Sequence, residues 1–240
     1  MTRRIARPCT DVPYLTKKQI EAEAALLLAE YGQDHGEVTA PPVPIDEIIE
    51  LHLRLTFELR DMRQLFKMAD VHGALWINEK TVRVDKSLDP EVHPGKRGRY
   101  RFTLAHEGGH WRLHRKHYVE DPNQGALFAG NLGKPAYICR SSEAKKPVEW
   151  QADHFAANLL MPREMVRAAW QDWRGGLVPM DLGQLRCDDG ATPAGESYDD
   201  ALMERFCRPL AERFEVSAEA MRYRLEELEL LVREKGALLF

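Results

Sequence analysis

Hydrophobic and polar positions follow two different periods along the first quarter of the chain. From Thr16 to Gly32 the apolar residues recur every three or four positions, as on one face of a helix. Thr16 and Gln19 have the spacing of a capping box, which marks where that helix begins. Over residues 53–59 apolar and polar residues alternate one by one, the period of a half-buried strand. A short helix is expected between them, near residues 46–51.

The middle of the chain predicts a hairpin followed by long helices. Apolar runs at 74–77 and 81–84 flank a polar turn and predict two strands. Helices are expected at 101–117, 147–161 and 162–173. The first two are separated by an irregular stretch rich in glycine and proline, of a length typical of functional or mobile loops.

The remainder favours a helical C-terminal region. The polar, turn-rich stretch 183–199 predicts a linker or flexible loop. Residues 210–231 have the outline of a helix-turn-helix, although Glu215 stands where such turns prefer glycine. We therefore expect an α+β protein, with a small antiparallel sheet packed against helices in residues 1–182 and a helical region in residues 200–240.

Composition places the chain among ordinary globular proteins. Hydrophobic residues make up 44% and charged residues 30% of the 240 positions, which disfavours disorder and allows a sizeable core. The net charge of −4 gives no general attraction to nucleic acid or anionic lipid. The chain shows neither a secretory signal nor a run of about 20 apolar residues, so we expect a cytoplasmic protein that does not span a membrane.

The four cysteines are scattered and include no CxxC pair. Their number and spacing predict neither a disulfide framework nor a zinc–cysteine site. We therefore expect reduced, mostly buried thiols at Cys9, Cys139, Cys187 and Cys207.

One short stretch carries the strongest chemical signal. His106 and His110 are four residues apart on a predicted helix, so both imidazoles can reach one zinc ion from the same face. Glu107 lies about 100° around that helix from His106, beside the ion and not on it. There it is placed to accept a proton from the attacking water. Gly108 and Gly109 are unfavourable inside a helix, which indicates close approach by a neighbouring element.

A catalytic zinc site needs a third protein ligand and one open position. Leu113 and Lys116 exclude the metzincin continuation, which requires glycine and histidine at these positions. Glu149, at the start of the second long helix, is the obvious alternative. Asp153 shares its face and could accept the free N–H of a ligand histidine. Nitrogen ligands with a single carboxylate favour zinc over manganese.

Other side chains near this stretch have open roles. His117 lies about 16 Å along the helix from His106, too far to bind the same ion. His114 is a candidate for ligand support, for substrate contact or for packing. The donor that stabilises the oxyanion is left open among Tyr137, Arg101 and His114.

Two stretches resemble the ImmA/IrrE-type zinc metallo-endopeptidases: RFTLAHEGGHWRLH at 101–114 and VEWQADHFAANLLMP at 148–162. The resemblance implies a zincin-like fold in which both helices bind the metal. Members of that family are often cytoplasmic bacterial or phage proteins that cleave, or otherwise inactivate, a helix-turn-helix repressor. A repressor-like protein substrate and an anti-repressor role in transcription regulation are therefore implied here too.

The same resemblance implies a gluzincin site, in which two helix histidines and a downstream glutamate bind zinc. On this chain those ligands are His106, His110 and Glu149, and the base is Glu107. Gly108 departs from the family, where a larger apolar residue is commoner, and this departure puts the local packing in question.

We expect zinc-dependent peptide hydrolysis, and two other functions stay open. A regulatory protein could bind a repressor or sense metal without cutting, and would keep its partner after Glu107→Gln. A DNA-binding regulator would use residues 210–231, with Arg222 and Arg224 on the duplex. Six basic residues against seven glutamates over 208–235 argue against DNA binding. The oligomeric state stays open.

Overall fold

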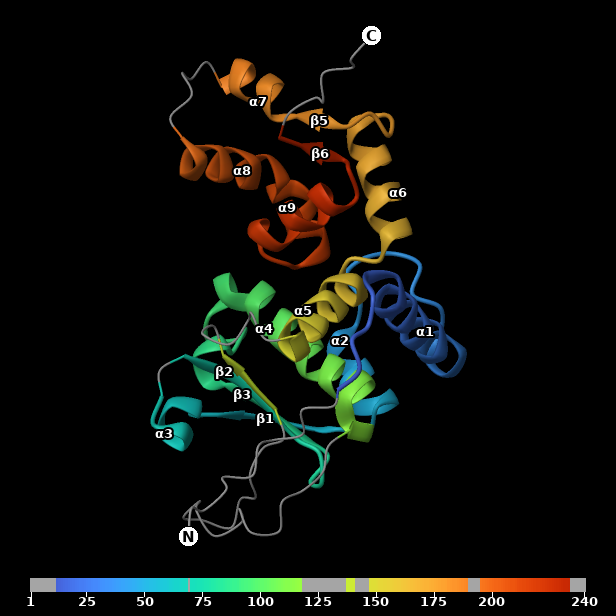
Figure 1. Ribbon diagram of the computed structural model, residues 1–240, viewed down its shortest axis with the longest axis vertical. Coiled ribbons are helices and arrows are strands. Elements are labelled where there is room, and N and C mark those ends of the chain that lie inside the picture. The colour runs from blue at the N-terminus through green and yellow to red at the C-terminus, as the bar shows by residue number, and fades with distance from the viewer. Residues whose placement is uncertain (1–11, 69, 118–136, 141–146, 190–194, 234–240) are drawn as a thin grey trace, which may run out of the picture. The chain divides into compact units, whose positions relative to one another are not determined.

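The structure is a computed structural model in which the chain forms two compact units (Figure 1). The first unit contains residues 1–37 and 44–159, and the second contains residues 38–43 and 160–240. The residues that the structure describes are 12–68, 70–117, 137–140, 147–189 and 195–233.

The first unit combines helices with one sheet. Its α-helices are α1 (Lys17–His35), α2 (Ile45–Glu47), α3 (Met62–Phe66), α4 (Arg97–Gly109) and α5 (Pro147–Leu160). Tighter or wider helical turns form η1 (Ile48–His52), η2 (Lys86–Leu88), η3 (Pro94–Lys96), η4 (His110–His114) and η5 (Arg115–His117). Its strands are β1 (Thr56–Arg60), β2 (Val71–Trp76), β3 (Thr81–Asp85) and β4 (Tyr137–Arg140).

The sheet has the order β1-β3-β2-β4. The predicted hairpin is confirmed, since β2 and β3 pair antiparallel, and β4 pairs antiparallel with the other edge of β2. The α+β class is also confirmed, but the expectation of a wholly antiparallel sheet is wrong, because β1 runs parallel to β3. Alternation of apolar residues predicts the two faces of a strand and not its neighbour, so the sequence could not reveal this pairing.

Helix α1 begins where the capping box predicts. The Thr16 side chain accepts from the Gln19 backbone, and Gln19 accepts from Thr16 in return. The helix continues past Gly32 to His35, because one interior glycine lowers helix stability by only about 1 kcal/mol. It ends at Gly36, whose φ of 102° suits glycine. Its buried face consists of Ile20, Ala24, Leu27 and Tyr31.

Helix α4 packs across the sheet and against α5 at glycine contacts. A Cβ on Gly73 in β2 would lie 2.6 Å from Cγ2 of Thr103 and 2.9 Å from Oε1 of Glu107. A Cβ on Gly109 would lie 3.3 Å from both Cα and the carbonyl oxygen of Ala152. The close approach predicted from the glycine pair in α4 is thus confirmed, and it brings the backbones of α4 and α5 together.

The second unit is helical, with a short parallel pair of strands. Its helices are α6 (Arg163–Arg174), α7 (Leu182–Asp189), α8 (Glu196–Phe214) and α9 (Ala218–Glu227), and its strands are β5 (Met180–Asp181) and β6 (Leu231–Val232). The linker prediction for 183–199 is wrong on either side of residues 190–194, which lie outside the described residues. Helix α7 forms there because Leu182 and Leu185 are buried within this polar stretch.

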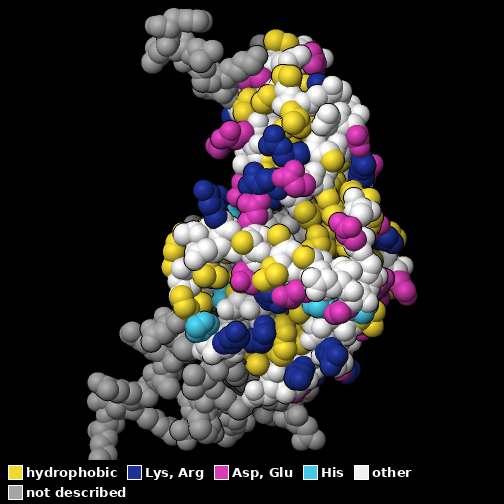
Figure 2. Space-filling model, turned by 90° about the vertical axis from the view of Figure 1, so that its right-hand side faces the viewer, with side chains coloured by type: hydrophobic (Ala, Val, Ile, Leu, Met, Phe, Trp, Pro, Cys, Tyr) yellow, Lys and Arg dark blue, Asp and Glu magenta, His cyan; other side chains and the backbone are white. Residues whose placement is uncertain are grey.

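The helix-turn-helix outline is found between α8 and α9. Glu215 adopts the left-handed conformation at the turn, with φ of 52°, and Ser217 caps the start of α9. No helix of the described chain combines the length and the apolar character needed to cross a bilayer. On the face shown in Figure 2, basic and acidic side chains are interleaved.

Candidate metal centre

Three of the residues singled out from the sequence meet between α4, η4 and α5. His106, His110 and Glu149 are buried, and one ligand atom from each lies within 4.8 Å of the other two. The two Nε2 atoms of the histidines are 3.0 Å apart. Oxygens of Glu149 lie 3.2 Å from Nε2 of His106 and 3.6 Å from Nε2 of His110.

These separations fit a divalent metal ion. A tetrahedral ion with bonds of about 2.0 to 2.1 Å holds its ligand atoms about 3.3 Å apart. The observed separations of 3.0, 3.2 and 3.6 Å lie around that value. Two imidazole nitrogens facing each other in a buried site also need a proton or a cation between them. Two nitrogens with one carboxylate oxygen are a donor set that suits zinc.

His106 is oriented by Asp153, one turn after Glu149 on α5. Nδ1 of His106 lies 2.8 Å from Oδ1 of Asp153. Because a carboxylate only accepts, Nδ1 carries the hydrogen and Nε2 faces the centre. Burial alone lowers the pKa of His106, but the neighbouring Cys139 and hydrogen bonds with Asp153 and Glu149 raise that pKa well above its usual value. The cluster therefore attracts positive charge.

His110 is oriented by a chain of neutral groups. Its Nδ1 lies 2.9 Å from Nδ1 of His114, whose Nε2 lies 3.3 Å from Oε1 of Gln151. Nε2 of Gln151 donates to the carbonyl oxygen of Pro13 over 3.1 Å. If Nε2 of His110 faces a metal, its Nδ1–H donates to Nδ1 of His114, and Nε2–H of His114 donates to Gln151. Every donor in this row of hydrogen bonds then meets an acceptor. Burial lowers the pKa of His114 to about 3, which keeps the imidazole neutral as the chain requires.

The wide turn of η4 places His114 within hydrogen-bond reach of His110. An uninterrupted α-helix was expected over 101–117, but the helix widens to i→i+5 hydrogen bonding over His110–His114. The ring centroids of His110 and His114 consequently lie 5.1 Å apart. Sequence reasoning left the role of His114 open and missed Gln151. The only signal for Gln151 was its place between Glu149 and Asp153.

Glu107 lies beside the three-donor cluster and is 0% exposed. Among the described residues neither carboxylate oxygen has a well-aligned hydrogen-bond partner, although the Cys139 backbone N–H faces it. Burial raises the pKa of Glu107 to about 8. The negative charge of Glu149 also raises this pKa, whereas the charge of His106 lowers it. A buried carboxyl group of this kind is typical of a general base.

The other sequence candidates lie around this cluster. His117 is half-buried in η5, and Arg101 is buried in α4. The side chain of Tyr137 lies outside the described residues, so the oxyanion donor stays open. Cys139 of β4 does join the site, with Sγ within 4.8 Å of a nitrogen of His106 and an oxygen of Glu107. Spacing along the chain gave no signal for this contact.

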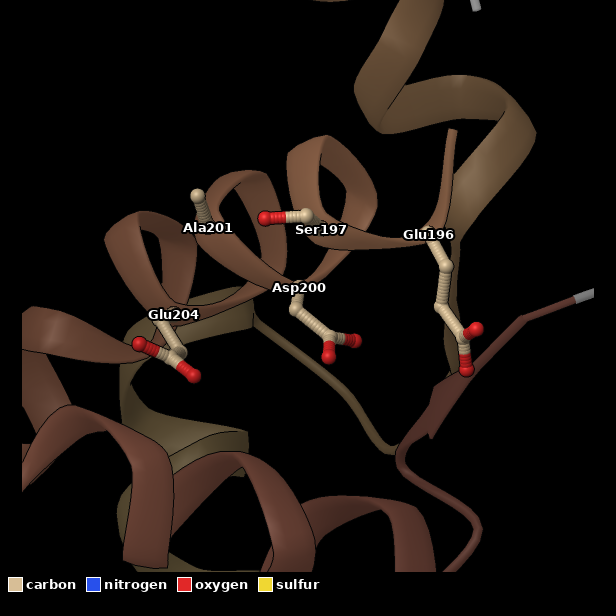
Figure 3. Close-up of a pocket in the computed structure, with 5 residues that line it drawn as sticks. All are labelled: Glu196, Ser197, Asp200, Ala201 and Glu204. Atoms are coloured by element: carbon tan, nitrogen blue, oxygen red, sulfur yellow. The ribbon is translucent and has the colours of Figure 1, made fainter. Parts of the chain in front are cut away.

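Two further polar groupings are weaker candidates. Ligand atoms of Asp34, His35 and His52 also lie within 4.8 Å of one another, but the first two residues are exposed. Carboxylates line a hollow on α8 (Figure 3), where Asp200 and Glu204 form ion pairs with Arg233 and Arg222. The hollow is lined by Glu196, Ser197, Asp200, Ala201 and Glu204. Neither grouping contains a buried donor set like that between α4 and α5.

Fold and site together have the features of a metallopeptidase-type protein: a sheet, a helix with the HExxH motif, and an acidic side chain from α5 beside it. Residues 95–226 match the peptidase M78 family model, described as the IrrE N-terminal-like domain. The match spans more than half of the chain, which therefore belongs to this family. The resemblance found in the sequence is thus confirmed. No curated protein matches the chain.

At Gly108, where a larger apolar residue is commoner in the family, a neighbouring side chain fills the space. A Cβ at this position would lie 3.0 Å from Cδ1 of Ile49 in η1. The isoleucine side chain thus occupies the space beside the glycine, and a Cβ there would meet Ile49 and Leu53.

Proposed function

We propose that this protein is a zinc-dependent endopeptidase that cleaves a repressor-like regulatory protein. His106, His110 and Glu149 would hold the metal, and Glu107 would be the general base. The observation that carries the proposal is the buried carboxyl group of Glu107, which has no well-aligned hydrogen-bond partner among the described residues and lies beside a three-donor cluster.

A bound zinc ion supplies a Lewis acid that polarises the scissile carbonyl and lowers the pKa of water. Glu107 takes the proton of the attacking water on a carboxylate oxygen and passes it to the nitrogen of the leaving amine. A carboxyl group with its pKa raised to about 8 can hold that proton between the two steps. Its position against Gly73 keeps it buried while it does so.

The surrounding residues prepare the donor set. Asp153 and His114 each engage Nδ1 of one ligand histidine, which directs both Nε2 lone pairs to the centre. Two neutral imidazoles and the Glu149 carboxylate leave a divalent ion with one net positive charge. This charge would stabilise the oxyanion that forms when the carbonyl is attacked.

A repressor-like substrate is proposed from the resemblance of residues 101–114 and 148–162 to the ImmA/IrrE-type endopeptidases. The DNA-binding alternative loses its two expected contacts, because Arg222 and Arg224 are each 2% exposed. Arg222 forms ion pairs with Glu204 and Glu226, and Arg224 pairs with Glu227. Buried, paired guanidinium groups are poorly placed to neutralise phosphates.

The test mixes the zinc-loaded full chain with the repressor encoded beside its gene and follows intact mass. Wild type, Glu107→Gln and the exposed-residue control Glu219→Gln are compared at equal metal content. We expect a discrete cut by wild type and control and none by Glu107→Gln. Equal complex formation without any cut would replace the peptidase with a binding protein. A cut by Glu107→Gln at the wild-type rate would remove the base from the proposal.

A further inference from the structure

Strand β4 brings a thiol to the metal centre. Sγ of Cys139 lies within 4.8 Å of a nitrogen of His106 and a carboxylate oxygen of Glu107. The register partner of Cys139 in β2 is Gly73, the residue whose missing side chain leaves room for Glu107. The position of the thiol is therefore set by the pairing of β4 with β2.

The other described cysteines have no comparable surroundings. Cys187 is exposed on α7 and Cys207 is buried in α8, so the expectation of mostly buried thiols holds fully only for Cys207. Neither belongs to a cluster of potential metal ligands among the described residues. Cys9 lies outside the described part of the chain. Cys187 and Cys207 therefore provide matched controls for Cys139.

His106 belongs to two overlapping groups of potential ligands. One group is His106 with His110 and Glu149, and the other is His106 with Glu107 and Cys139. A zinc ion held by three protein ligands has one open tetrahedral position. Thiolate sulfur is a ligand that zinc favours, at about 2.3 Å. Cys139 is grouped with His106 and not with His110 and Glu149, so its sulfur would have to move toward these two residues to share their ion.

We propose that Cys139 is a fourth protein ligand of the metal in the resting protein, closing the position that hydrolysis requires. This inference rests on the proposed metal site and adds a closed state to it. On binding, the S–H bond breaks, sulfur donates its electron pair to the metal, and the proton passes to solvent. Ligation by Cys139 fills the open position. Cleavage then requires displacement of the thiolate.

The test replaces zinc by cobalt(II) in the full-length protein and records its absorption spectrum. A cobalt–thiolate bond gives a charge-transfer band in the near ultraviolet, which histidine and carboxylate ligands do not give. We expect the band in wild type, Cys187→Ser and Cys207→Ser, and its loss in Cys139→Ser with one cobalt still bound. One bound cobalt without the band in wild type, or the band persisting in Cys139→Ser, would overturn the proposal.

A second measurement needs no variant and covers the case in which Cys139→Ser fails to fold. Wild-type protein is treated with iodoacetamide with and without cobalt, and carboxamidomethylation of each cysteine is followed by peptide mass. Sulfur displaces iodide in this reaction, and a thiolate whose electron pair is bound to a metal is a poorer nucleophile. The metal-bound Cys139 should therefore react at about one tenth of its metal-free rate or more slowly. Protection of Cys139 alone is expected, and equal rates with and without metal would contradict the ligation. Cobalt that binds without protecting Cys139 would leave the proposed function standing.

Discussion

Both units of the chain bury charged side chains, but the cluster around Glu107 in the first unit neutralises them differently from the buried arginines of the second unit. In the second unit Arg222 lies 3.3 to 3.5 Å from carboxylate oxygens of Asp200, Glu204 and Glu226. Arg224 donates to a carboxylate oxygen of Glu227 over 2.8 Å. Each cation there faces acids supplied by the same unit, which is typical of structural ion pairing.

The buried cluster of the first unit lacks such internal balance. Among the described residues neither carboxylate oxygen of Glu107 has a well-aligned hydrogen-bond partner, and the Nε2 atoms of His106 and His110 face each other at 3.0 Å. The pKa of Glu107 is raised, whereas in the second unit hydrogen bonding to Arg186 lowers the pKa of Asp199. The comparison indicates that the first cluster is built to receive an ion, while the second is complete.

The largest effect should come from removing a metal ligand in the first cluster. His110→Ala should weaken zinc binding by about 10²- to 10³-fold, because a zinc-binding free energy of about 10–16 kcal/mol is shared among about four ligands. Competition with a chelating dye measures this affinity. His117→Ala is the matched control, since His117 is half-buried in η5 outside the cluster, and it should bind zinc as wild type does. Equal affinity in His110→Ala would contradict the assigned site.

In the second unit the largest effect should be on folding instead. Arg224→Met removes the donor to the Met161 carbonyl and the partner of Glu227, and should lower the free energy of unfolding by about 2–4 kcal/mol. Urea denaturation measures this change, and zinc affinity should stay unchanged. In the exposed pair of Arg213 with Asp172, Arg213→Met should change stability by less than about 1 kcal/mol. A loss of zinc binding in Arg224→Met would break the comparison.

A smaller effect is expected where a ligand histidine is supported indirectly. His114→Phe removes the acceptor for Nδ1–H of His110 and should weaken zinc binding about 10- to 100-fold. His114→Gln, whose amide oxygen can accept the same hydrogen, should recover part of that affinity. Because both variants alter packing, each is compared by thermal unfolding without metal. Equal zinc affinity in His114→Phe and wild type would assign His114 a packing role only.

What the sequence could predict depends on how far apart along the chain the interacting groups lie. His106 and His110 share one helix, so their spacing alone places them on a common face, and the same reasoning pairs Glu149 with Asp153. That α4 and α5 meet followed from the resemblance, and Gly109 gave the physical hint of close packing.

The remaining features depend on tertiary pairing that linear spacing does not encode. Cys139 reaches the site only because β4 pairs with β2 opposite Gly73. The parallel pairing of β1 with β3 likewise follows from the route of the chain. Helix α7 was mistaken for a linker because two buried leucines, Leu182 and Leu185, were outweighed by their polar neighbours.

The smallest effect concerns the acid stability of the second unit. Hydrogen bonds from Arg186 and Arg233 lower the pKa values of Asp199 and Asp200. A carboxyl group whose pKa is lower in the folded state stabilises that state above its unfolded pKa of about 3.9, and this stabilisation is lost as the pH falls. The urea midpoint should therefore decrease between about pH 5 and pH 3, and less steeply in Asp199→Asn than in wild type. Equal slopes would show that these pairs are screened by solvent.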